Sequence, residues 1–226
     1  MSDDNQSARA QILGSVTRSL SNAGLRDKAA VEARMAAKAS NLIPARSKGL
    51  DREGLSNLFV AKAEEAAASV DRVASLADVP EAVSRYLASN NLPSRIIQAP
   101  AFQMEGVDWS HLPALEVKTG TPDGSEDTSL TPVLAAVAET ATLMLTSDKT
   151  TPTGLNFLPE NHVAVVYRSQ IVGPLEEAWA RLQEQSSEMP RTVNLITGPS
   201  RTGDIEQKIQ MGAHGPRRLH IILIED

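Results

Sequence analysis

Residues 194–206 read Asn-Leu-Ile-Thr-Gly-Pro-Ser-Arg-Thr-Gly-Asp-Ile-Glu, and this segment decides both the fold class and the candidate site. The mostly aliphatic run 193–196 ends at Gly198-Pro199, which predicts a buried strand followed by a sharp turn. Residues 203–206 are typical of the first turn of a helix. A strand that passes through a glycine-containing loop into a helix exposes unpaired N–H groups. Together with the helix dipole and a guanidinium, these groups suit a carboxylate or phosphate.

The same loop does not match two common catalytic loops. The spacing of Gly198 and Gly203 resembles a Walker A loop, but Asp204 stands where that loop requires lysine, so the nucleotide interpretation fails. The segment also lacks the last glycine of a nucleophile elbow, and no Ser-His-Asp order is apparent. Two interpretations stay open. The segment is either an anion-binding loop or an ordinary βα turn in which Thr202 caps a helix and Arg201 is solvated.

Composition limits the functional classes. The 226 residues suffice for one α/β domain with an arm, and 41% hydrophobic with 22% charged residues is ordinary for a globular protein. The net charge of −6 argues against a general nucleic-acid binder, which needs a basic surface. Because the chain has no cysteine, it cannot by itself form a disulfide, a thiolate zinc site or an iron–sulfur cluster. No apolar run approaches the ~20 residues of a membrane span and the N-terminus lacks a signal pattern, so we expect a soluble, cytoplasmic protein.

The chain is expected to divide into an N-terminal helical arm, residues 1–45, and an α/β domain, residues 46–226. Apolar residues at helical spacing within 2–20 and an alanine-rich stretch at about 27–39 predict two helices in the arm. Short helices with narrow apolar faces are marginal in isolation, so they need a surface to lie on. We therefore expect the arm to contribute to subunit contacts, including those of a homo-oligomer.

Strands and helices are expected to alternate after residue 51. The predicted strands are 69–74, 95–98, 115–118, 140–146, 163–167, 193–196 and 219–224. The predicted helices are 55–66, 78–90, 133–138 after the pair Thr131-Pro132, and the segment that follows Gly173-Pro174. This alternation predicts an α/β fold with a largely parallel sheet covered on both faces.

Five motifs occur in a specific order. They are Ala138-Glu139-Thr140-Ala141-Thr142-Leu143, His162-Val163-Ala164-Val165-Val166, the loop Gly198–Glu206, Gly212-Ala213-His214-Gly215-Pro216, and His220-Ile221-Ile222-Leu223. In this order, over about residues 130–226, they resemble the LUD-domain family, specifically lactate utilization protein C. One departure concerns Ala141, which stands where the family motif Glu-Thr-Gly-Thr has glycine. An added methyl group there would narrow a ligand pocket if the backbone must approach the ligand closely.

The resemblance implies both a fold and a role. The fold is similar to that of the sugar-phosphate isomerases and CoA transferases, with three layers and an open, mostly parallel sheet between helices. The role is that of a non-cluster subunit in the oxidation of L-lactate to pyruvate, beside the iron–sulfur lactate utilization proteins A and B. On this view the chain binds no cofactor of its own, and the clusters belong to its partners. Whether the chain is itself an enzyme stays open. The alternatives are a stand-alone enzyme acting on a phosphorylated or acyl-CoA metabolite, by analogy of fold alone, and a purely structural adaptor.

The candidate site residues follow from the loop and from the motifs. Arg201 is a candidate bidentate clamp for a carboxylate, and Glu139 and His214 are candidates for catalytic proton transfer. The remaining candidates, with hydroxyl or backbone groups that suit an anion, are Thr140, Thr142, Gly198, Ser200 and Thr202. We expect these groups to converge at the carboxyl ends of adjacent strands, with the amides of residues 200–202 in the anion seat, because open α/β sheets bind ligands at that edge.

Histidine 162 leads a predicted buried strand, and a hydrogen-bonded histidine at a strand edge is favoured over a catalytic one. His162, His214 and Glu139 have the composition of a metal site, but their spacing is not diagnostic, so no metal site is predicted.

Overall fold

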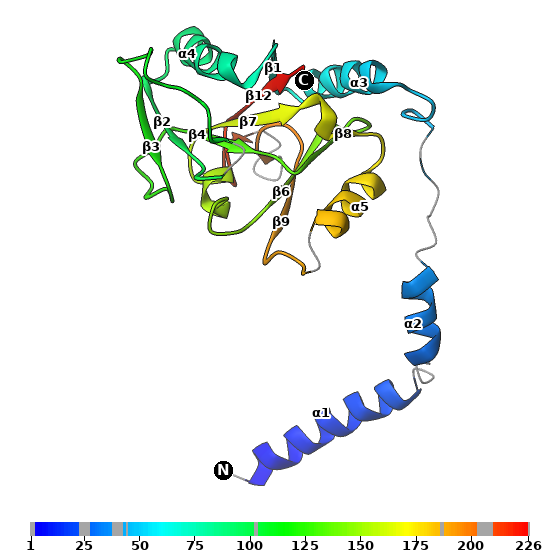
Figure 1. Cartoon of the computed structure of the whole chain (residues 1–226). Helices are drawn as coiled ribbons and strands as arrows, with labels where there is room; N and C mark the ends of the chain where they lie inside the picture. Colours follow the sequence, from blue (N-terminus) through cyan, green and yellow to red (C-terminus); the bar gives the residue numbers. More distant parts are fainter. Residues whose placement is uncertain are drawn as a thin grey trace. The chain divides into compact units, whose positions relative to one another are not determined.

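The computed structural model describes residues 3–22, 28–37, 43, 45–101, 104–185, 188–202 and 210–225. Its internal contacts divide the chain into two units, Met1–Ile43 and Pro44–Asp226. The first unit contains α1 (Asp3–Asn22) and α2 (Lys28–Ala37) (Figure 1). Large apolar side chains of α1 are exposed, among them Ile12 and Leu20. Within the described ranges no helix has both the length and the apolar character that crossing a lipid bilayer requires.

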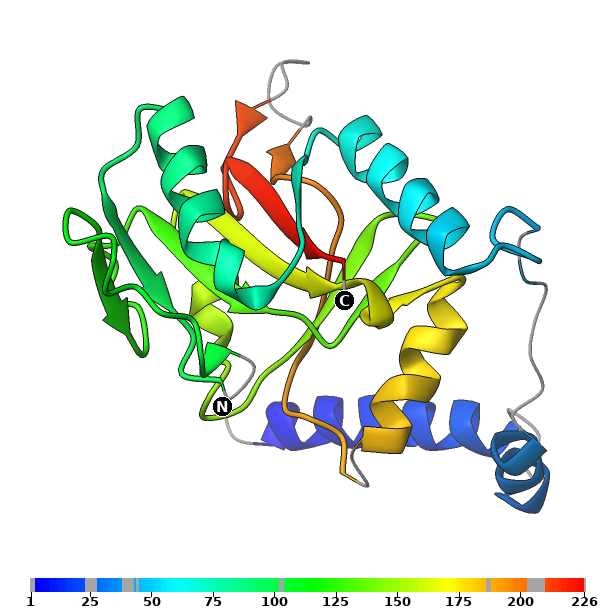
Figure 2. The same cartoon turned by 45° about the horizontal axis from the view of Figure 1, so that its top comes forward.

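The second unit is built on a six-stranded sheet in which all neighbouring strands are parallel. In spatial order its strands are β1 (Ser69–Val73), β12 (Arg218–Ile224), β7 (Asn161–Tyr167), β4 (Thr128–Pro132), β2 (Arg95–Gln98) and β3 (Glu116–Thr119). Figure 2 shows β12, in red, between β1 and β7. Ser69 in β1 therefore pairs with His220 in β12, a residue 151 positions later in the chain.

Both faces of this parallel sheet are buried, which explains its nearly continuous apolar strands. In β7, Val163 and Val165 face one core cluster, while Ala164 and Val166 face another. The first of these clusters is completed by α4 (Val79–Ser89), whose buried residues include Val83. Strands with side chains buried on both faces carry few polar residues, so His162 and His220 stand out in the sheet.

The opposite face of the parallel sheet packs on a second sheet of four strands. Its order is β8 (Ile171–Val172), β5 (Ala135–Val137), β6 (Thr142–Thr146) and β9 (Val193–Ile196), and β6 is antiparallel to both of its neighbours. Phe59 and Ala63 of α3 (Arg52–Glu65) join the core between the two sheets. The outer face of the second sheet is covered by Ala178 and Leu182 of α5 (Leu175–Gln185). The expected α/β fold, with a mostly parallel sheet flanked by helices, is confirmed.

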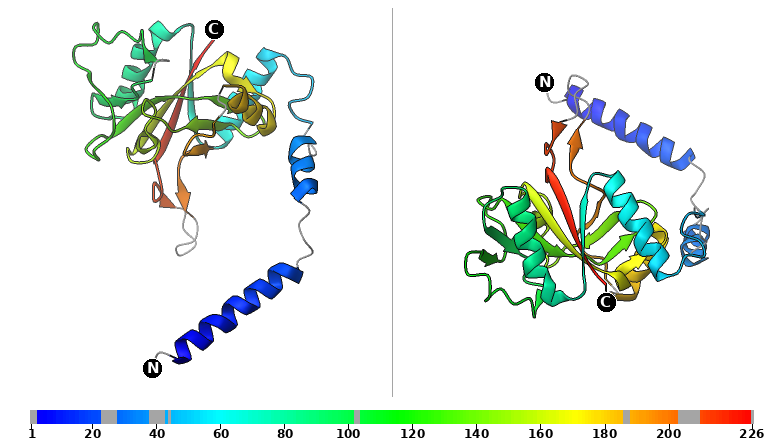
Figure 3. Two further views of the ribbon diagram at one scale, coloured as in Figure 1. Left: turned by 60° about the horizontal axis from the view of Figure 1, so that its bottom comes forward. Right: turned by 90° about the horizontal axis from the view of Figure 1, so that it is seen from above.

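Two local predictions differ from the structure. The helix predicted at 133–138 is wrong, because the chain leaves β4 at Pro132 and forms β5 three residues later. The second concerns Thr202, which was considered as the cap of a helix. It lies instead in β10 (Arg201–Thr202), which pairs antiparallel with β11 (Gln210–Met211) (Figure 3). The helix start predicted at 203–206 lies outside the described residues.

Short 3₁₀ helices complete the connections. They are η1 (Leu76–Asp78), η3 (Thr153–Asn156) and η4 (Arg168–Gln170). The last residue of η3, Asn156, is buried and lines two cavities.

Candidate functional site

Most of the predicted loop residues line one cavity of about 260 Å³, which we call the Arg201 cavity. Its lining residues are Asn156, Phe157, His162, Leu195, Ile196, Thr197, Gly198, Pro199, Ser200, Arg201, His214, Gly215, Pro216 and Leu219. His162 and Leu219 are the second residues of β7 and β12, so the cavity lies at the amino ends of these parallel strands. This position differs from the carboxyl edge that we expected. The loop does follow the carboxyl end of a strand, but that strand is β9 of the second sheet.

Gly198 fixes the course of the loop against the end of α3. Its φ is 65°, and a Cβ atom there would lie 2.2 Å from the carbonyl oxygen of Ala66. Both the left-handed backbone and the close approach therefore require glycine. Arg201 donates from Nη2 to the same carbonyl oxygen at 3.1 Å. Ala66 is the C-cap of α3, where a cation is favoured by the negative end of the helix dipole. The guanidinium is thus held at the cavity, and its remaining N–H groups have no acceptor in the part of the chain that the structure describes.

Ser200 joins the loop to residues 212–216. Its amide donates to the carbonyl of Pro216 at 2.9 Å, and its carbonyl accepts from the amide of Gly212 at 3.0 Å. Its Oγ accepts from the amide of His214 at 3.2 Å. The Ser200 amide is therefore engaged, which corrects the expectation that it would form part of an anion seat. Oγ acts only as an acceptor in the contact with His214, so its hydroxyl proton has no acceptor among the described residues.

Among the residues that the structure describes, the cavity lining offers several donors and no carboxylate. Besides Arg201 and the Ser200 hydroxyl, the amides of Gly198 and Gly215 have no acceptor among the described residues. Glycine-rich loops with free amides and a nearby guanidinium favour small oxyanions. Thr202 pairs with Gln210 in the β10–β11 hairpin and is not among the lining residues.

His162 is a lining residue that sequence reasoning did not include among the site residues. Its side chain is fully buried, and burial lowers its pKa to about 4, so the imidazole is neutral near pH 7. Nε2 lies 2.7 Å from Thr131 Oγ1, and Nδ1 has no partner within the described part of the chain. An orphaned N–H is rarer in protein interiors than an orphaned acceptor, so we assign the proton to Nε2 and a free lone pair to Nδ1. In the sequence, His162 is recognisable only as a histidine at the start of a buried strand. The local pattern does not show that the loop containing Gly198 lines the same cavity.

A chain of hydroxyl groups connects two of the predicted residues to the cavity. Thr140 Oγ1 lies 2.7 Å from Thr142 Oγ1, which in turn lies 2.7 Å from Thr197 Oγ1. Thr197 lines the cavity, whereas Thr140 and Thr142 do not. Thr142 is therefore one hydrogen bond away from a residue that lines the cavity, and Thr140 is two hydrogen bonds away.

Glu139 has a different environment. It is buried, and its carboxylate accepts a hydrogen bond of 2.7 Å from the hydroxyl of Ser47, a residue that precedes α3. Glu139 does not line the Arg201 cavity. The structure thus brings Gly198, Ser200, Arg201 and His214 together but leaves Glu139 with Ser47, and a catalytic role for Glu139 stays a prediction. Within the described ranges, no group of three or more His, Cys, Asp or Glu side chains is arranged to hold a metal ion.

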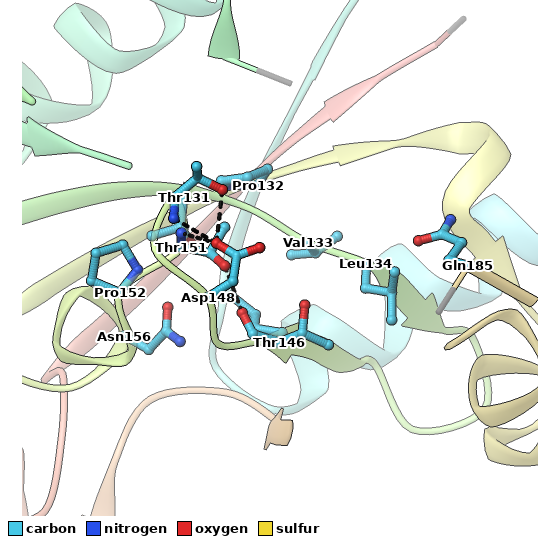
Figure 4. Close-up of a pocket in the computed structure, with 12 residues that line it drawn as sticks. Thr131, Pro132, Val133, Leu134, Thr146, Asp148, Thr151, Pro152, Asn156 and Gln185 are labelled. Carbon is cyan, nitrogen blue, oxygen red and sulfur yellow. Dashed lines mark hydrogen bonds between the residues drawn. The ribbon is translucent and has the colours of Figure 1, made fainter. Parts of the chain in front are cut away.

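A second cavity of about 210 Å³, which we call the Asp148 cavity, lies at the carboxyl ends of β4 and β6 (Figure 4). Asp148 Oδ1 accepts from the amide and hydroxyl of Thr150 and from the amide of Thr151. Burial raises the pKa of Asp148, but these hydrogen bonds outweigh burial and hold it below its ordinary value. Asn156 lines both cavities. The hydrogen bond between Thr131 and His162 also joins a residue of one cavity to a residue of the other.

A parallel sheet flanked by helices, with a loop cavity at its edge, defines the class of this protein as α/β. The chain belongs to the LUD-domain family, whose model matches residues 50–224. It is similar to lactate utilization protein C of Macrococcus caseolyticus, with 36% identity over 93 residues, which is 40% of each chain. It is also similar to lactate utilization protein C of Geobacillus thermodenitrificans, with 34% identity over 93 residues, 40% of this chain and 39% of the relative. The matches thus span about 40% of the length of these curated relatives.

A solved structure supports the same architecture. The crystal structure of a DUF162 family protein from Deinococcus radiodurans matches with a TM-score of 0.55 and 23% sequence identity. The match covers 78% of this chain and 99% of that protein. At this identity the likeness establishes the fold alone.

Proposed function

We propose that this chain is a non-cluster subunit of an L-lactate utilization system and that it binds a small carboxylate in the Arg201 cavity. The relatives named lactate utilization protein C support the metabolic context. The LUD-domain match over residues 50–224 includes every residue that we assign to the cavity. The relatives and this chain align over less than half of their lengths, so the role is carried over as a proposal.

The observation that carries the proposal is the meeting of Gly198, Ser200, Arg201 and His214 in one cavity, whose described lining contains no carboxylate. In this proposal the carboxylate of the ligand accepts hydrogen bonds from Arg201, the Ser200 hydroxyl and the loop amides. A hydroxyl on the neighbouring carbon of the ligand donates to Nδ1 of His162, which is otherwise without a partner among the described residues. Such an arrangement suits a 2-hydroxy acid better than an acid without the hydroxyl, because an unmet buried acceptor costs free energy.

The proposed partners come from the resemblance to lactate utilization protein C, and the absence of cysteine in this chain is compatible with them. Oxidising a 2-hydroxy acid to a 2-oxo acid releases two electrons, and this chain has no thiolate to hold an iron–sulfur cluster that would accept them. We propose that the acceptor clusters lie on partner proteins that resemble lactate utilization proteins A and B. Co-purification of a tagged full-length chain with iron-containing partners tests this part, and recovery of the chain without them would contradict it.

Calorimetric titration of the full chain with L-lactate and with propionate tests the binding site. We expect L-lactate to bind more tightly than propionate. We also expect Arg201→Ala to weaken L-lactate binding by a factor of about 30 or more, because a charge-assisted contact contributes roughly 2–4 kcal/mol. Arg191→Ala is the matched control, since Arg191 is exposed and does not line the cavity. Equal affinities of the two variants, or no L-lactate binding by the wild-type chain, would overturn the proposal. Retention of partners without ligand binding would instead indicate a structural adaptor.

A further inference from the structure

The Arg201 cavity has more room than a lactate ion needs. Its volume of about 260 Å³ lies close to the lower end of the range of ~300–1,000 Å³ that is typical of sites for drug-sized ligands. Beyond its carboxylate and hydroxyl groups, lactate carries only a methyl group. These polar groups can therefore occupy the donors near Arg201 and still leave part of the cavity unfilled. The other lining residues indicate what else the ligand contains.

Two large apolar side chains of the lining, Phe157 and Leu195, are left uncovered by the protein. Phe157 is 39% exposed and Leu195 is 44% exposed. Neither belongs to, or packs against, a buried cluster of the described residues. In this they differ from Leu219, which also lines the cavity but is part of the core between the sheets. Apolar surface that lines a cavity without joining the core is available to a ligand.

The exposure of Leu195 follows from the alternation of side chains along β9. Ile196 packs against the core between the two sheets, and Val193 packs against the cluster that includes Ala178 of α5. Leu195 lies on the same face of β9 as Val193, but it does not pack against that cluster. Its side chain thus remains exposed at the end of the strand that leads into the cavity loop.

Gly215 shows how close Phe157 lies to the proposed carboxylate donors. A Cβ atom on Gly215 would lie 3.6 Å from Phe157 Cδ1 and 3.6 Å from Ser200 Cβ. The aromatic ring and the Ser200 side chain are therefore no further apart than twice that distance. A ligand whose carboxylate accepts a hydrogen bond from the Ser200 hydroxyl can reach the ring with a short hydrocarbon side chain.

We propose that the preferred ligand of the Arg201 cavity is a 2-hydroxy acid with an apolar side chain bulkier than methyl, of the size of an isobutyl group. Its carboxylate and hydroxyl groups bind as proposed above, and its side chain packs on Phe157 and Leu195. This inference rests on the proposed carboxylate site, and it deepens that proposal by naming the class of substrate. Phe157 and Leu195 then determine specificity, because they favour ligands that remove more apolar carbon from water.

The test is calorimetric titration of the full chain with L-lactate, L-2-hydroxyisocaproate and 3-methylbutan-1-ol. We expect L-2-hydroxyisocaproate, which has an isobutyl side chain, to bind more tightly than L-lactate by a factor of about ten or more. Equal affinities, or tighter binding of lactate, would overturn this inference and leave the carboxylate site standing. If neither acid binds, the carboxylate site is wrong and this inference fails with it. Binding of the alcohol as tight as that of the larger acid would indicate adhesion to apolar surface alone and would also overturn the inference.

Variants that shorten a side chain locate the isobutyl group. Phe157→Ala and Leu195→Ala should each lower the preference for the larger acid over lactate by a factor of about three or more, because less apolar surface remains for contact. Leu158→Ala is the matched control, since Leu158 follows Phe157, is 62% exposed and does not line the cavity. The control should keep the wild-type preference. An equal effect of Leu158→Ala and Phe157→Ala would refute the proposed contact.

Gly215→Ala adds a methyl group instead of removing one. The new Cβ atom would make only ordinary van der Waals contacts with Phe157 and Ser200, and the backbone amide is retained, so the chain should fold. The methyl group would occupy the space between the ring and Ser200. We expect it to lower the affinity for L-2-hydroxyisocaproate more than that for L-lactate. An unchanged preference would show that the side chain of the ligand does not lie along the ring and would overturn the inference.

Discussion

At the scale of single residues, Gly198 and Ala141 both have a left-handed backbone in crowded surroundings, but only one of them is glycine. Ala141 has φ 52° and is 1% exposed, and its methyl group is part of the core cluster that includes Phe59. The left-handed conformation of a residue with a Cβ atom costs ~1–2 kcal/mol, and burying a methyl group returns roughly 0.8 kcal/mol. This compensation accounts for alanine at a position where the resembling motif has glycine. At Gly198 no compensation is available, because the carbonyl of Ala66 occupies the space.

Replacing Gly198 therefore separates two effects, the close approach of the backbone to the Ala66 carbonyl and the strain of the left-handed backbone. Gly198→Ala is expected to lower the free energy of unfolding by more than ~3 kcal/mol, since the new methyl group meets a backbone oxygen and the left-handed strain adds to it. The matched control is Gly49→Ala, because Gly49 has φ 79° and nothing within 4 Å of a new Cβ atom. The control should lose only ~1–2 kcal/mol. Urea denaturation measures both, and similar losses would show that the contact with Ala66 is not restrictive.

The two buried histidines predict how stability depends on pH. Burial lowers the pKa of His162 and of His220 to about 4, below the unfolded value of 6.5. The unfolded chain therefore binds more protons between these values, so stability is fully present above about pH 6.5 and falls toward pH 4. Each histidine should contribute a loss of about 3 kcal/mol over this window. In thermal unfolding, His162→Asn should flatten the dependence on pH, whereas His111→Asn, at an exposed position, should keep the wild-type slope. A variant at His162 with the wild-type slope would contradict this cause.

At the scale of secondary-structure elements, α1 differs from every element of the second unit. Ile12, Leu13, Val16 and Leu20 share one side of α1 at helical spacing and are 49–70% exposed. In contrast, the buried clusters among the described residues contain only residues between Phe59 and Ile224. An exposed apolar stripe of this length is a surface for association. We propose that it contributes to subunit contacts.

Deleting residues 1–42 tests that proposal. The melting temperature of the remaining chain should change by less than about 2 °C, because no core residue is removed. Sedimentation velocity should show the loss of self-association or of partner binding. In the full chain, Leu20→Ser should reproduce the loss, while Arg18→Ser on the same helix should not. Unchanged association after the deletion would count against a role for α1 in subunit contacts.

Most elements of the fold could be predicted from the sequence, because their apolar patterns are local. The strands β2, β7, β9 and β12 were predicted within two residues of their observed ends. Residues 133–138 were mistaken for a helix, since a short run of Val, Leu and Ala has no periodicity that separates a helix from a buried strand. Here the pairing of Ala136 with Leu143 and with Ile171 decides the outcome, and these partners are not visible in the local sequence.

At the scale of the whole molecule, the candidate site could be predicted in its residues but not in its position. Gly198, Ser200, Arg201 and His214 were identified from their motifs and line one cavity. The cavity lies at the amino ends of β7 and β12 because β9 belongs to the second sheet, a topology that the local pattern does not contain. His162 and Asn156 were missed for the same reason. Their places in the cavity lining depend on loops that approach from distant parts of the chain.

The cysteine-free composition makes a prediction for the purified chain. We expect no visible absorption band and no lactate oxidation by the isolated chain, because it lacks thiolates for a cluster and a Gly-x-Gly-x-x-Gly dinucleotide fingerprint. Absorption spectroscopy, metal analysis and an assay with an artificial electron acceptor measure these properties. If the proposed iron–sulfur partners are correct, adding them to the chain should produce lactate oxidation. Stoichiometric iron or flavin in the isolated chain would refute the prediction.

The position of β12 also has a consequence for biosynthesis. During translation, β1 is complete long before β12 exists, and its partner His220 is made 151 residues after Ser69. Until β12 has left the ribosome, the edges of β1 and β7 that it will occupy are unpaired, and the core of Ile221, Ile222 and Leu223 is missing. Unpaired strand edges in nascent chains are aggregation-prone. We therefore expect a chain stalled before β12 to be bound by chaperones and sensitive to protease, and to become resistant only when this strand enters the sheet.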